Sequence, residues 1–274
     1  MRVSIRCAAA LFLLAGGPAG AAPLQASVLP GSRSVELGNP VTIFATIVNT
    51  LAADAANCSI ALPGTAPSGL ALSYQTTDPN TNALTGTPNT PVPIPAYQGQ
   101  SFLLTFQGST SLDLQALAPV YSCDSLAPAA TVPGVDTIDL TLSAKPVADI
   151  VALAATPMDN GILVVPTNGA AAFAVASINL GIAAPLTVTA DTGQTALPLT
   201  LTLCQTVSAT AQCMGTPTAS VSLSFAQGAS PTFSVFAQAA GPIDFDPANA
   251  RIFVRFTDTG GAQHGSTSVA VETQ

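Results

Sequence analysis

The sequence has few charged side chains. Asp, Glu, Lys and Arg make up 7% of its 274 residues, against about 25% in an average soluble domain. Six basic residues face 14 acidic ones, which gives a formal net charge of −8, and Lys145 is the only lysine. Nucleic acids and anionic membranes are bound by clustered Lys and Arg side chains. The composition therefore argues against both as partners.

Tryptophan is absent, and histidine occurs once. Without Trp the chain lacks the commonest platform for stacking sugar rings or bases, which weakens the case for a carbohydrate-binding protein. The single His264 lies in the turn-like sequence Gly260–Gly265, and a hydrolytic triad needs a nucleophile beside an oriented base. We therefore predict that His264 is a solvated loop residue, and that the protein is not an enzyme and holds no cofactor.

The first 21 residues resemble a secretory signal peptide. Arg2 and Arg6 precede an apolar stretch from Cys7 to Ala15, and small residues lead up to Ala21, after which we expect cleavage. Loss of both arginines would make the net charge −10. The apolar stretch is shorter than the roughly 20 residues that span a bilayer, and no later segment qualifies. We predict no integral membrane segment, and a secreted or periplasmic protein that could also reside at the cell surface.

Four cysteines remain after the signal: Cys58, Cys123, Cys204 and Cys213. An even number in an exported chain favours disulfide bonds over metal ligands or a catalytic thiol. Four cysteines allow three pairings. We expect Cys58 with Cys123 and Cys204 with Cys213, because each bond then closes within one half of the chain. The cysteines lack the close paired spacing of a zinc site, so no metal site is predicted.

Apolar and polar residues alternate over several short segments, as in strands with one buried face. Clear cases are 138–143, 197–203, 219–225 and 252–256. Gly and Pro clusters separate such segments at short intervals, and no long segment after the signal has a helical period. These observations predict an all-β fold in which antiparallel strands form sandwiches.

The length that remains after the signal suits two domains. We place the boundary at Lys145–Ala148, so that the predicted domains are 22–146 and 147–274. Two stretches of the first half have counterparts, in the same order, in the second: Phe44–Asn49 with Phe173–Asn179, and Gln98–Phe106 with Gln227–Phe236. The sequence therefore predicts a diverged tandem of one fold.

The order Tyr121-Ser122-Cys123 is similar to a feature of immunoglobulin-type sandwiches. There, a Tyr two residues before the second Cys hydrogen-bonds back across the preceding corner. Together with the stretch from Tyr74 to Val92, it makes the chain resemble the immunoglobulin-like modules of uncharacterised exported proteobacterial proteins. The resemblance implies two tandem immunoglobulin-like antiparallel β-sandwich domains and brings no assigned activity. Cys58 follows the strand that carries the first Cys in antibody domains, which departs from their pattern.

Five charged residues near the C-terminus could form a polar patch: Asp244, Asp246, Arg251, Arg255 and Asp258. The two arginines lie four apart, on one face of a predicted strand. The patch could be a Ca²⁺ site or a docking surface, or its Arg and Asp side chains could simply pair across neighbouring strands. Calcium needs six or more oxygen ligands, and the EF-hand pattern is absent, so we prefer simple pairing.

The segment from Thr76 to Ala96 is crowded with Thr, Asn and Pro and has few apolar side chains. Long loops on a sandwich are either functional or loosely ordered. If the first domain has a recognition surface, this segment is where we expect it.

These observations favour an exported, non-enzymatic structural or protein-interaction protein of the cell envelope, the surface or the extracellular matrix. Soluble β-proteins usually protect exposed sheet edges with Lys and other charges, and this chain has one lysine. We therefore expect an edge to pair with a protein partner or a second copy by β-strand addition. The alternative function is a periplasmic small-ligand or Ca²⁺-binding module that uses the groove between the domains or the acidic residues near Asp244.

Overall fold

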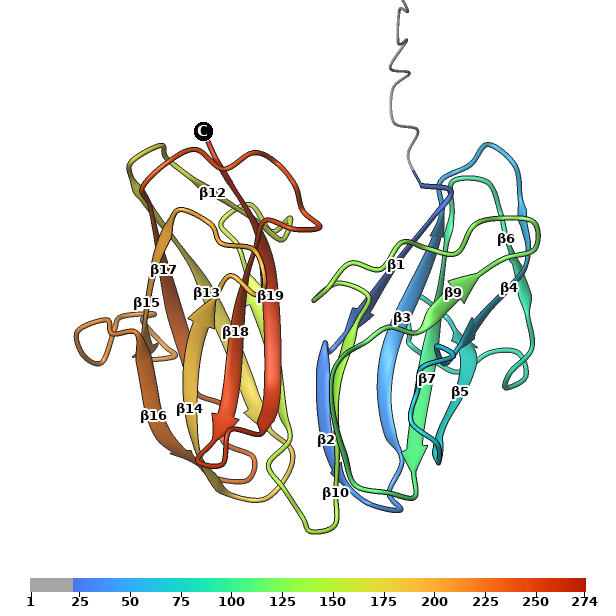
Figure 1. Ribbon diagram of the computed structural model, residues 1–274, viewed down its shortest axis with the longest axis horizontal. Helices are drawn as coiled ribbons and strands as arrows, with labels where there is room; N and C mark the ends of the chain where they lie inside the picture. The colour runs from blue at the N-terminus through green and yellow to red at the C-terminus, as the bar shows by residue number, and fades with distance from the viewer. Residues whose placement is uncertain (1–21) are drawn as a thin grey trace, which may run out of the picture.

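The computed structural model describes residues 22–274, and all of their regular secondary structure is β-strand (Figure 1). The predicted all-β fold is confirmed. The predicted signal peptide lies outside the described residues. Within residues 22–274 there is no helix long and apolar enough to cross a membrane.

The first half of the described chain builds one four-stranded sheet, in the order β1-β3-β7-β5, and two three-stranded sheets, β2-β10-β8 and β6-β4-β9. All of these pairings are antiparallel except β2 with β10. The strands are β1 (Leu24–Leu29), β2 (Ser32–Glu36), β3 (Val41–Asn49), β4 (Ala55–Ala61), β5 (Leu70–Thr77), β6 (Val92–Ile94), β7 (Gly99–Gly108), β8 (Leu112–Leu117), β9 (Val120–Ser122) and β10 (Ile138–Ser143).

The second half builds a four-stranded sheet, β11-β13-β17-β15, and a five-stranded sheet, β12-β19-β18-β14-β16. Here β12 and β19 are the parallel pair. The strands are β11 (Ile150–Ala155), β12 (Ile162–Val165), β13 (Ala170–Asn179), β14 (Ala184–Asp191), β15 (Leu199–Thr206), β16 (Ser220–Phe225), β17 (Thr232–Ala239), β18 (Arg251–Asp258) and β19 (Gln263–Thr273).

The two halves repeat one topology. The sheet β1-β3-β7-β5 reappears as β11-β13-β17-β15, and the parallel pair recurs in both halves. The counterpart stretches seen in the sequence fall on equivalent strands, β3 with β13 and β7 with β17. In the first half two short strands take the place of β18: β8 pairs with β10, and β9 pairs with β4. The interruption follows from Ala116, whose φ of 52° breaks the extended backbone, and from Pro119 just beyond it.

The four alternating segments of the sequence all lie on strands. Residues 138–143 are β10, and 252–256 lie within β18. The segment 219–225 matches β16 apart from its first residue, while 197–203 overlaps β15, which begins at Leu199. Alternation located these strands because each has one buried face.

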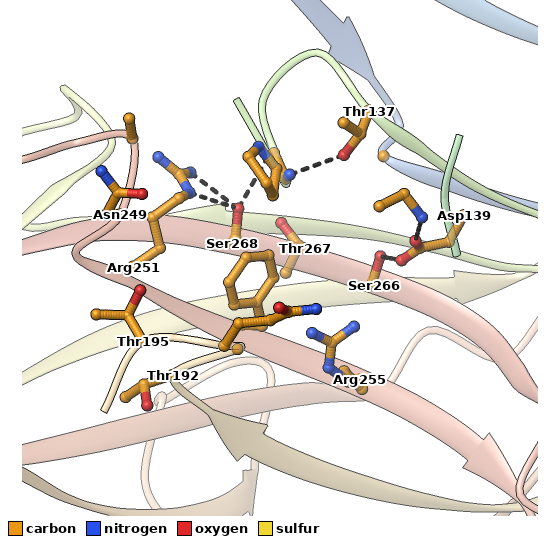
Figure 2. A pocket seen from close by; sticks show the side chains of 18 residues that line it. Thr137, Asp139, Thr192, Thr195, Asn249, Arg251, Arg255, Ser266, Thr267 and Ser268 are labelled. Atoms are coloured by element: carbon orange, nitrogen blue, oxygen red, sulfur yellow. Dashed lines mark hydrogen bonds between the residues drawn. The ribbon is translucent and has the colours of Figure 1, made fainter. Parts of the chain in front are cut away.

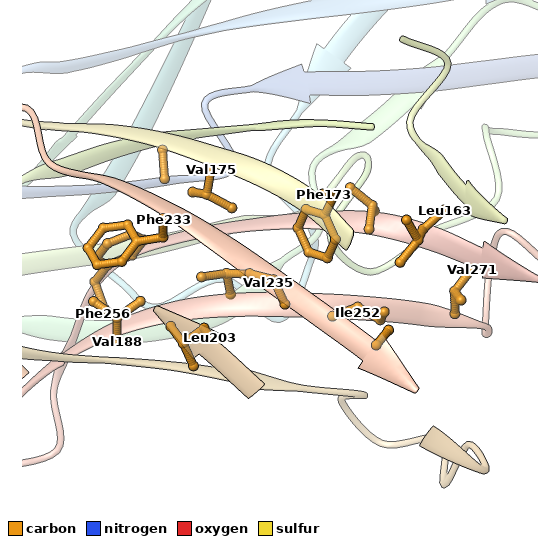
Figure 3. Packing of buried hydrophobic residues seen from close by; sticks show 14 of the residues in the cluster. Leu163, Phe173, Val175, Val188, Leu203, Phe233, Val235, Ile252, Phe256 and Val271 are labelled. Carbon is orange, nitrogen blue, oxygen red and sulfur yellow. The ribbon is translucent and has the colours of Figure 1, made fainter. Parts of the chain in front are cut away.

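Buried apolar side chains form two clusters. One runs from Leu24 to Leu142, and the other from Ala148 to Val271. In the second cluster the rings of Phe225, Phe233 and Phe256 meet at centroid distances of 5.8 to 6.3 Å. Figure 3 shows Phe233 and Phe256 among the aliphatic side chains of both sheets. Such ring contacts stabilise a core beyond the area that they bury.

A buried asparagine ends the equivalent strands β3 and β13 and links the layers of each half. The Asn49 amide nitrogen donates to the carbonyl oxygens of Ile94 and Pro95 at 3.1 and 3.2 Å. The Asn179 amide nitrogen donates to the carbonyl oxygens of Phe225 at 3.1 Å and Ile182 at 2.8 Å. Both side chains are fully buried, and the bonds to Ile94 and Phe225 satisfy carbonyl groups that water cannot reach.

Tyr121 is buried, and its hydroxyl donates to the carbonyl oxygen of Asp136 at 3.2 Å. The bond runs forward in the chain, so Tyr121 departs from the immunoglobulin-type pattern, in which the hydroxyl bonds back across the preceding corner. The physical reason is the loop after Cys123. It returns across Tyr121 before β10 begins and brings a backbone carbonyl to the hydroxyl.

The outer edges of two strands are covered by the chain itself. Along β5, the amide of Thr85 donates to Thr76 O at 2.8 Å, and that of Asn89 donates to Tyr74 O at 2.7 Å. The segment that follows β5 is thus fixed along its edge by hydrogen bonds. Along β15, Leu203 and Thr218 exchange two backbone bonds of 2.8 and 3.0 Å. Both edges are thereby closed to another strand.

Candidate binding cleft between the halves

The two halves meet along β2 and β10 of the first half and β11 and β19 of the second. Arg33 Nη2 lies 2.9 Å from Asp149 Oδ2, and Arg33 Nε donates to both carboxylate oxygens at 3.1 and 3.2 Å. The backbone amide of Ser34 donates to Asp149 Oδ1 at 2.9 Å. Asp149 is nearly buried, so this ion pair fixes the first turn of the second half against β2.

A second contact centres on Asp139 of β10. Its carboxylate accepts hydrogen bonds from Ser266 Oγ at 2.7 Å and from Gln263 Nε2. The amide of Ser266 donates in turn to Ser32 Oγ at 2.7 Å. These polar side chains are largely buried between the halves and are paired with one another, as buried polar groups must be.

Beside these contacts lies a cleft of 460 Å³ that both halves line (Figure 2). The lining residues are Gly31, Ala116, Pro133, Gly134, Thr137 and Asp139 from the first half and Thr192, Gly193, Gln194, Thr195, Ala248, Asn249, Arg251, Phe253, Arg255, Ser266, Thr267 and Ser268 from the second. The volume falls within the range of small-molecule sites, roughly 300 to 1,000 Å³.

Strand β18 supplies the wall of the cleft with the largest side chains. Arg251, Phe253 and Arg255 alternate along it and therefore share one face. The Arg255 guanidinium carbon lies 4.8 Å from the centre of the Phe253 ring, a cation–π contact. The opposite face of β18 carries Ile252, Val254 and Phe256 into the core.

The Phe253 ring is fitted between two glycines. A Cβ at Gly134 of the first half would lie 2.6 Å from the ring, and a Cβ at Gly193 of the second half would lie 2.8 Å from it. Both glycines also have positive φ, at 75° and 63°. Any side chain there would push the loops off the ring, so both positions need glycine to keep the cleft in shape.

Arg251 and Arg255 differ in their partners. Arg255 Nε pairs with Asp191 Oδ2 at 2.8 Å, and its Nη1 donates to Gln263 Oε1 at 3.0 Å. Arg251 donates only to neutral oxygens, those of Ser268 and Pro247. Burial lowers the pKa of Arg251 to about 10, which leaves it charged at neutral pH.

The aspartates of the predicted polar patch lie apart from these arginines. Asp246 Oδ2 accepts from Asn249 Nδ2 at 2.8 Å, Asp258 bonds within the β18–β19 turn, and Asp244 is exposed. Among residues 22–274 no ion pair joins any of the three to Arg251 or Arg255. No group of three or more His, Cys, Asp or Glu side chains in that range could hold a metal ion.

His264 is buried at the start of β19, with 4% of its surface exposed. The prediction of a solvated loop residue is therefore wrong. Its Nε2 lies 3.0 Å from Asp258 Oδ2. β19 begins at Gln263, earlier than the glycine-rich sequence indicates, so His264 lies within the β18–β19 hairpin and not in the turn.

The disulfide bonds lie away from the cleft. Cys58 on β4 bonds to Cys123, which directly follows the neighbouring strand β9. Cys204 on β15 bonds to Cys213 in the segment that covers the β15 edge. The first bond thus joins two adjacent strands, and the second fastens a covering segment to its strand.

The sequence predicted a groove between the domains only as an alternative ligand site, and it did not indicate the loops that line the cleft. Loop residues 132–137 lie more than a hundred positions from the strand that they contact, and their only local signal is a Pro-Gly turn. The alternation on β18 marked Arg251 as one of two arginines on a shared face, which is the part of the cleft that the sequence did indicate.

No protein-family model matches the sequence, and no curated protein matches it. Among solved structures, a protein of unknown function from Porphyromonas gingivalis shares 13% identity at a TM-score of 0.26, over 92% of this chain and 99% of that one. The major pilin subunit of Bacillus cereus shares 10% identity at a TM-score of 0.27, over 81% and 70%. The CupB6 tip adhesin of Pseudomonas aeruginosa shares 10% at a TM-score of 0.21, over 92% and 99%. Sequence identities and TM-scores this low do not support any inference about function.

Proposed function

We propose that this is an exported, non-enzymatic structural protein of the periplasm or cell surface, with two immunoglobulin-like domains, residues 22–146 and 147–274, that pairs with a second copy through the edge of β16. Two disulfide bonds support an oxidising compartment. A repeated two-layer topology with a separate core in each half supports two domains.

The observation that carries self-association is the open edge of β16. Its β14 ladder uses one side of the strand, and no backbone hydrogen bond joins the other side of Ser222 or Ser224 to any segment in residues 22–274. The equivalent strand of the first half, β6, is only three residues long and contains Pro93, which has no amide to donate. One half therefore blunts this edge, and the other leaves it open.

Pro185 shows which amides of β16 face outward. It lies opposite Ser224 and can donate no ladder bond, and Leu186 lies opposite Leu223. Bonded and non-bonded pairs alternate along an antiparallel ladder, so the backbone of Leu223 faces β14 and that of Ser222 faces outward. Ser222 is exposed, so a second strand can reach it.

The composition of β16 suits pairing with an identical strand. Residues 219–226 contain no charged side chain, so two copies meet without the repulsion that like charges opposite each other would cause. Antiparallel pairing about a two-fold axis joins the two five-stranded sheets into one. A two-fold interface of this kind is closed and does not continue into a fibre.

The test is Ser222→Pro, analysed by size-exclusion chromatography with light scattering over a concentration series. The wild type should dimerise as its concentration rises, whereas the variant should stay monomeric at an unchanged melting temperature, because proline is tolerated where the amide faces away from the ladder. Ser222→Ala is the matched control and should dimerise normally. A wild type that stays monomeric at every concentration, or a Ser222→Pro variant that dimerises as well as wild type, would contradict the proposal.

A further inference from the structure

The cleft ends at a buried cation without a counter-charge. Arg251 is 7% exposed. Its Nε and Nη2 donate to Ser268 Oγ at 3.3 and 2.8 Å, and its Nη1 donates to Pro247 O at 2.9 Å. No carboxylate of residues 22–274 lies within ion-pair distance of it.

A buried guanidinium that meets only neutral oxygens is destabilising, because those oxygens replace the water shell only in part. A guanidinium carries five N–H groups, and Arg251 uses three of them. One N–H on each terminal nitrogen is left. Such a pair can bind both oxygens of one carboxylate, the arrangement that arginine favours.

The surroundings of Arg251 are suited to a small polar molecule. The hydroxyl group of Thr195 has no hydrogen-bond partner within residues 22–274, and Thr195 lines the same cleft. Figure 2 shows Thr195 and Asn249 at the end of the cleft where Arg251 lies. Phe253 adds an apolar wall beside them. The site therefore offers one unpaired cation, a free hydroxyl group and a surface for a short carbon chain.

Arg255 shows by contrast why the anion belongs at Arg251. Its charge is already matched by Asp191 at 2.8 Å, and Gln263 takes a second N–H group. The remaining acid of the lining, Asp139, is occupied by Ser266, Gln263 and the amide of Ala116. Arg251 is thus the one cation of the lining without an acid beside it.

We propose that the cleft binds a small organic acid whose carboxylate pairs with Arg251. The volume of 460 Å³ fits such a molecule, and walls from both halves would enclose it. The proposal gives a specific chemistry to the small-ligand function expected from the sequence. It does not depend on pairing through β16, so either proposal can fail without the other.

The test is a titration of the full exported chain with succinate at constant ionic strength, followed by calorimetry and thermal melting. Succinamide is the neutral control of similar shape, and inorganic phosphate tests another anion. Succinate should bind and raise the melting temperature, while succinamide should do neither. Arg251→Gln should weaken succinate binding by roughly ten- to a hundredfold, the usual effect of losing a charged hydrogen-bonding partner.

Lys145→Gln is the matched control, since it removes one positive charge from an exposed position outside the cleft, and succinate binding should persist. Arg251→Gln should fold, because it removes an uncompensated buried charge. The comparison of succinate with succinamide on the wild type tests the proposal without any variant. Equal binding of succinate and succinamide, undiminished binding by Arg251→Gln, or binding of phosphate but not succinate would each overturn it.

Discussion

Single buried polar residues hold this protein together at places where a sandwich has no regular hydrogen bonds. Asn49 and Asn179 each satisfy backbone carbonyls of the facing layer, and Asp136 binds the amide of Val132 at 2.7 Å. The sequence places both asparagines at the ends of matching strands, but it does not show their role. That role depends on carbonyl groups some 45 residues away, which only the folded chain brings into reach.

Asp136 should make stability fall as the pH rises from about 4 to about 6. Burial raises its pKa from 3.8 to about 6, so the folded state holds the proton more tightly than the unfolded chain does. The stabilisation is complete below the unfolded pKa and is lost as the pH passes the folded one. Urea unfolding of the wild type and of Asp136→Asn, compared at each pH, isolates this effect. The asparagine variant keeps an oxygen for Val132.

The free energy of unfolding of the wild type, minus that of Asp136→Asn, should decrease across this interval and then level off. Other carboxylates titrate in both proteins and cancel in the difference. Parallel curves for the two proteins would contradict the expectation.

At the scale of strands, the molecule protects the edges of β5, β6 and β15 with its own loops, a proline and a disulfide bond instead of charges. Because the sequence has a single lysine, it indicates that lysine side chains do not protect the sheet edges. Alternation locates β10 and β18 well, because each has one buried face. It does not show that Thr85 and Asn89 bond along β5. Thr- and Asn-rich segments read as free loops when their partner strand is unknown.

The two disulfide bonds should differ in what their removal costs. Cys58 and Cys123 are 65 positions apart, whereas Cys204 and Cys213 are 9 apart. Loop-closure entropy then predicts that replacing the first pair with alanine lowers the free energy of unfolding by about 4 kcal/mol, and that replacing the second pair lowers it by about 3 kcal/mol. Urea unfolding of the two double variants measures both losses.

Loss of the second bond should also expose an edge. The amide of Leu203 donates to Thr218 in the covering segment, so its hydrogen exchange should speed up when Cys204 and Cys213 are replaced. The Cys58 and Cys123 variant serves as the control and should leave that amide protected. Unchanged exchange at Leu203 would show that the covering segment holds without the bond.

For the whole molecule, the polar contact between the halves decides their arrangement. The Arg33–Asp149 pair is nearly buried, with side-chain exposures of 17% and 7%. Sequence patterns cannot locate such a contact, because Arg33 lies on a short strand far from Asp149 in the chain. The boundary at Lys145–Ala148 rests on length and on the order of matching stretches in the two halves, and it remains a prediction that cleavage can test.

Limited digestion with elastase should cut between Ala144 and Val147, where the chain is exposed or half-buried, and should release two stable fragments. Asp149→Asn should speed this cut and lower the free energy of unfolding by about 3 kcal/mol, because Arg33 would lose its counter-charge in a buried site. Asp191→Asn breaks the more exposed ion pair with Arg255 and should lower the free energy of unfolding by less than about 1 kcal/mol. A single core that resists division would refute the boundary.

The path of the chain has a mechanical consequence. Figure 1 shows the start of β1 and the end of β19 at the same end of the molecule, while the link from Ser143 to Ile150 turns at the opposite end. Tension applied through both termini would therefore separate the two halves, beginning at the end that carries the termini, while the link at the opposite end keeps them joined. The Arg33–Asp149 bridge and the Asp139 contacts would give way before either sandwich was stretched along its strands. The protein could thus lengthen under load with both of its cores intact.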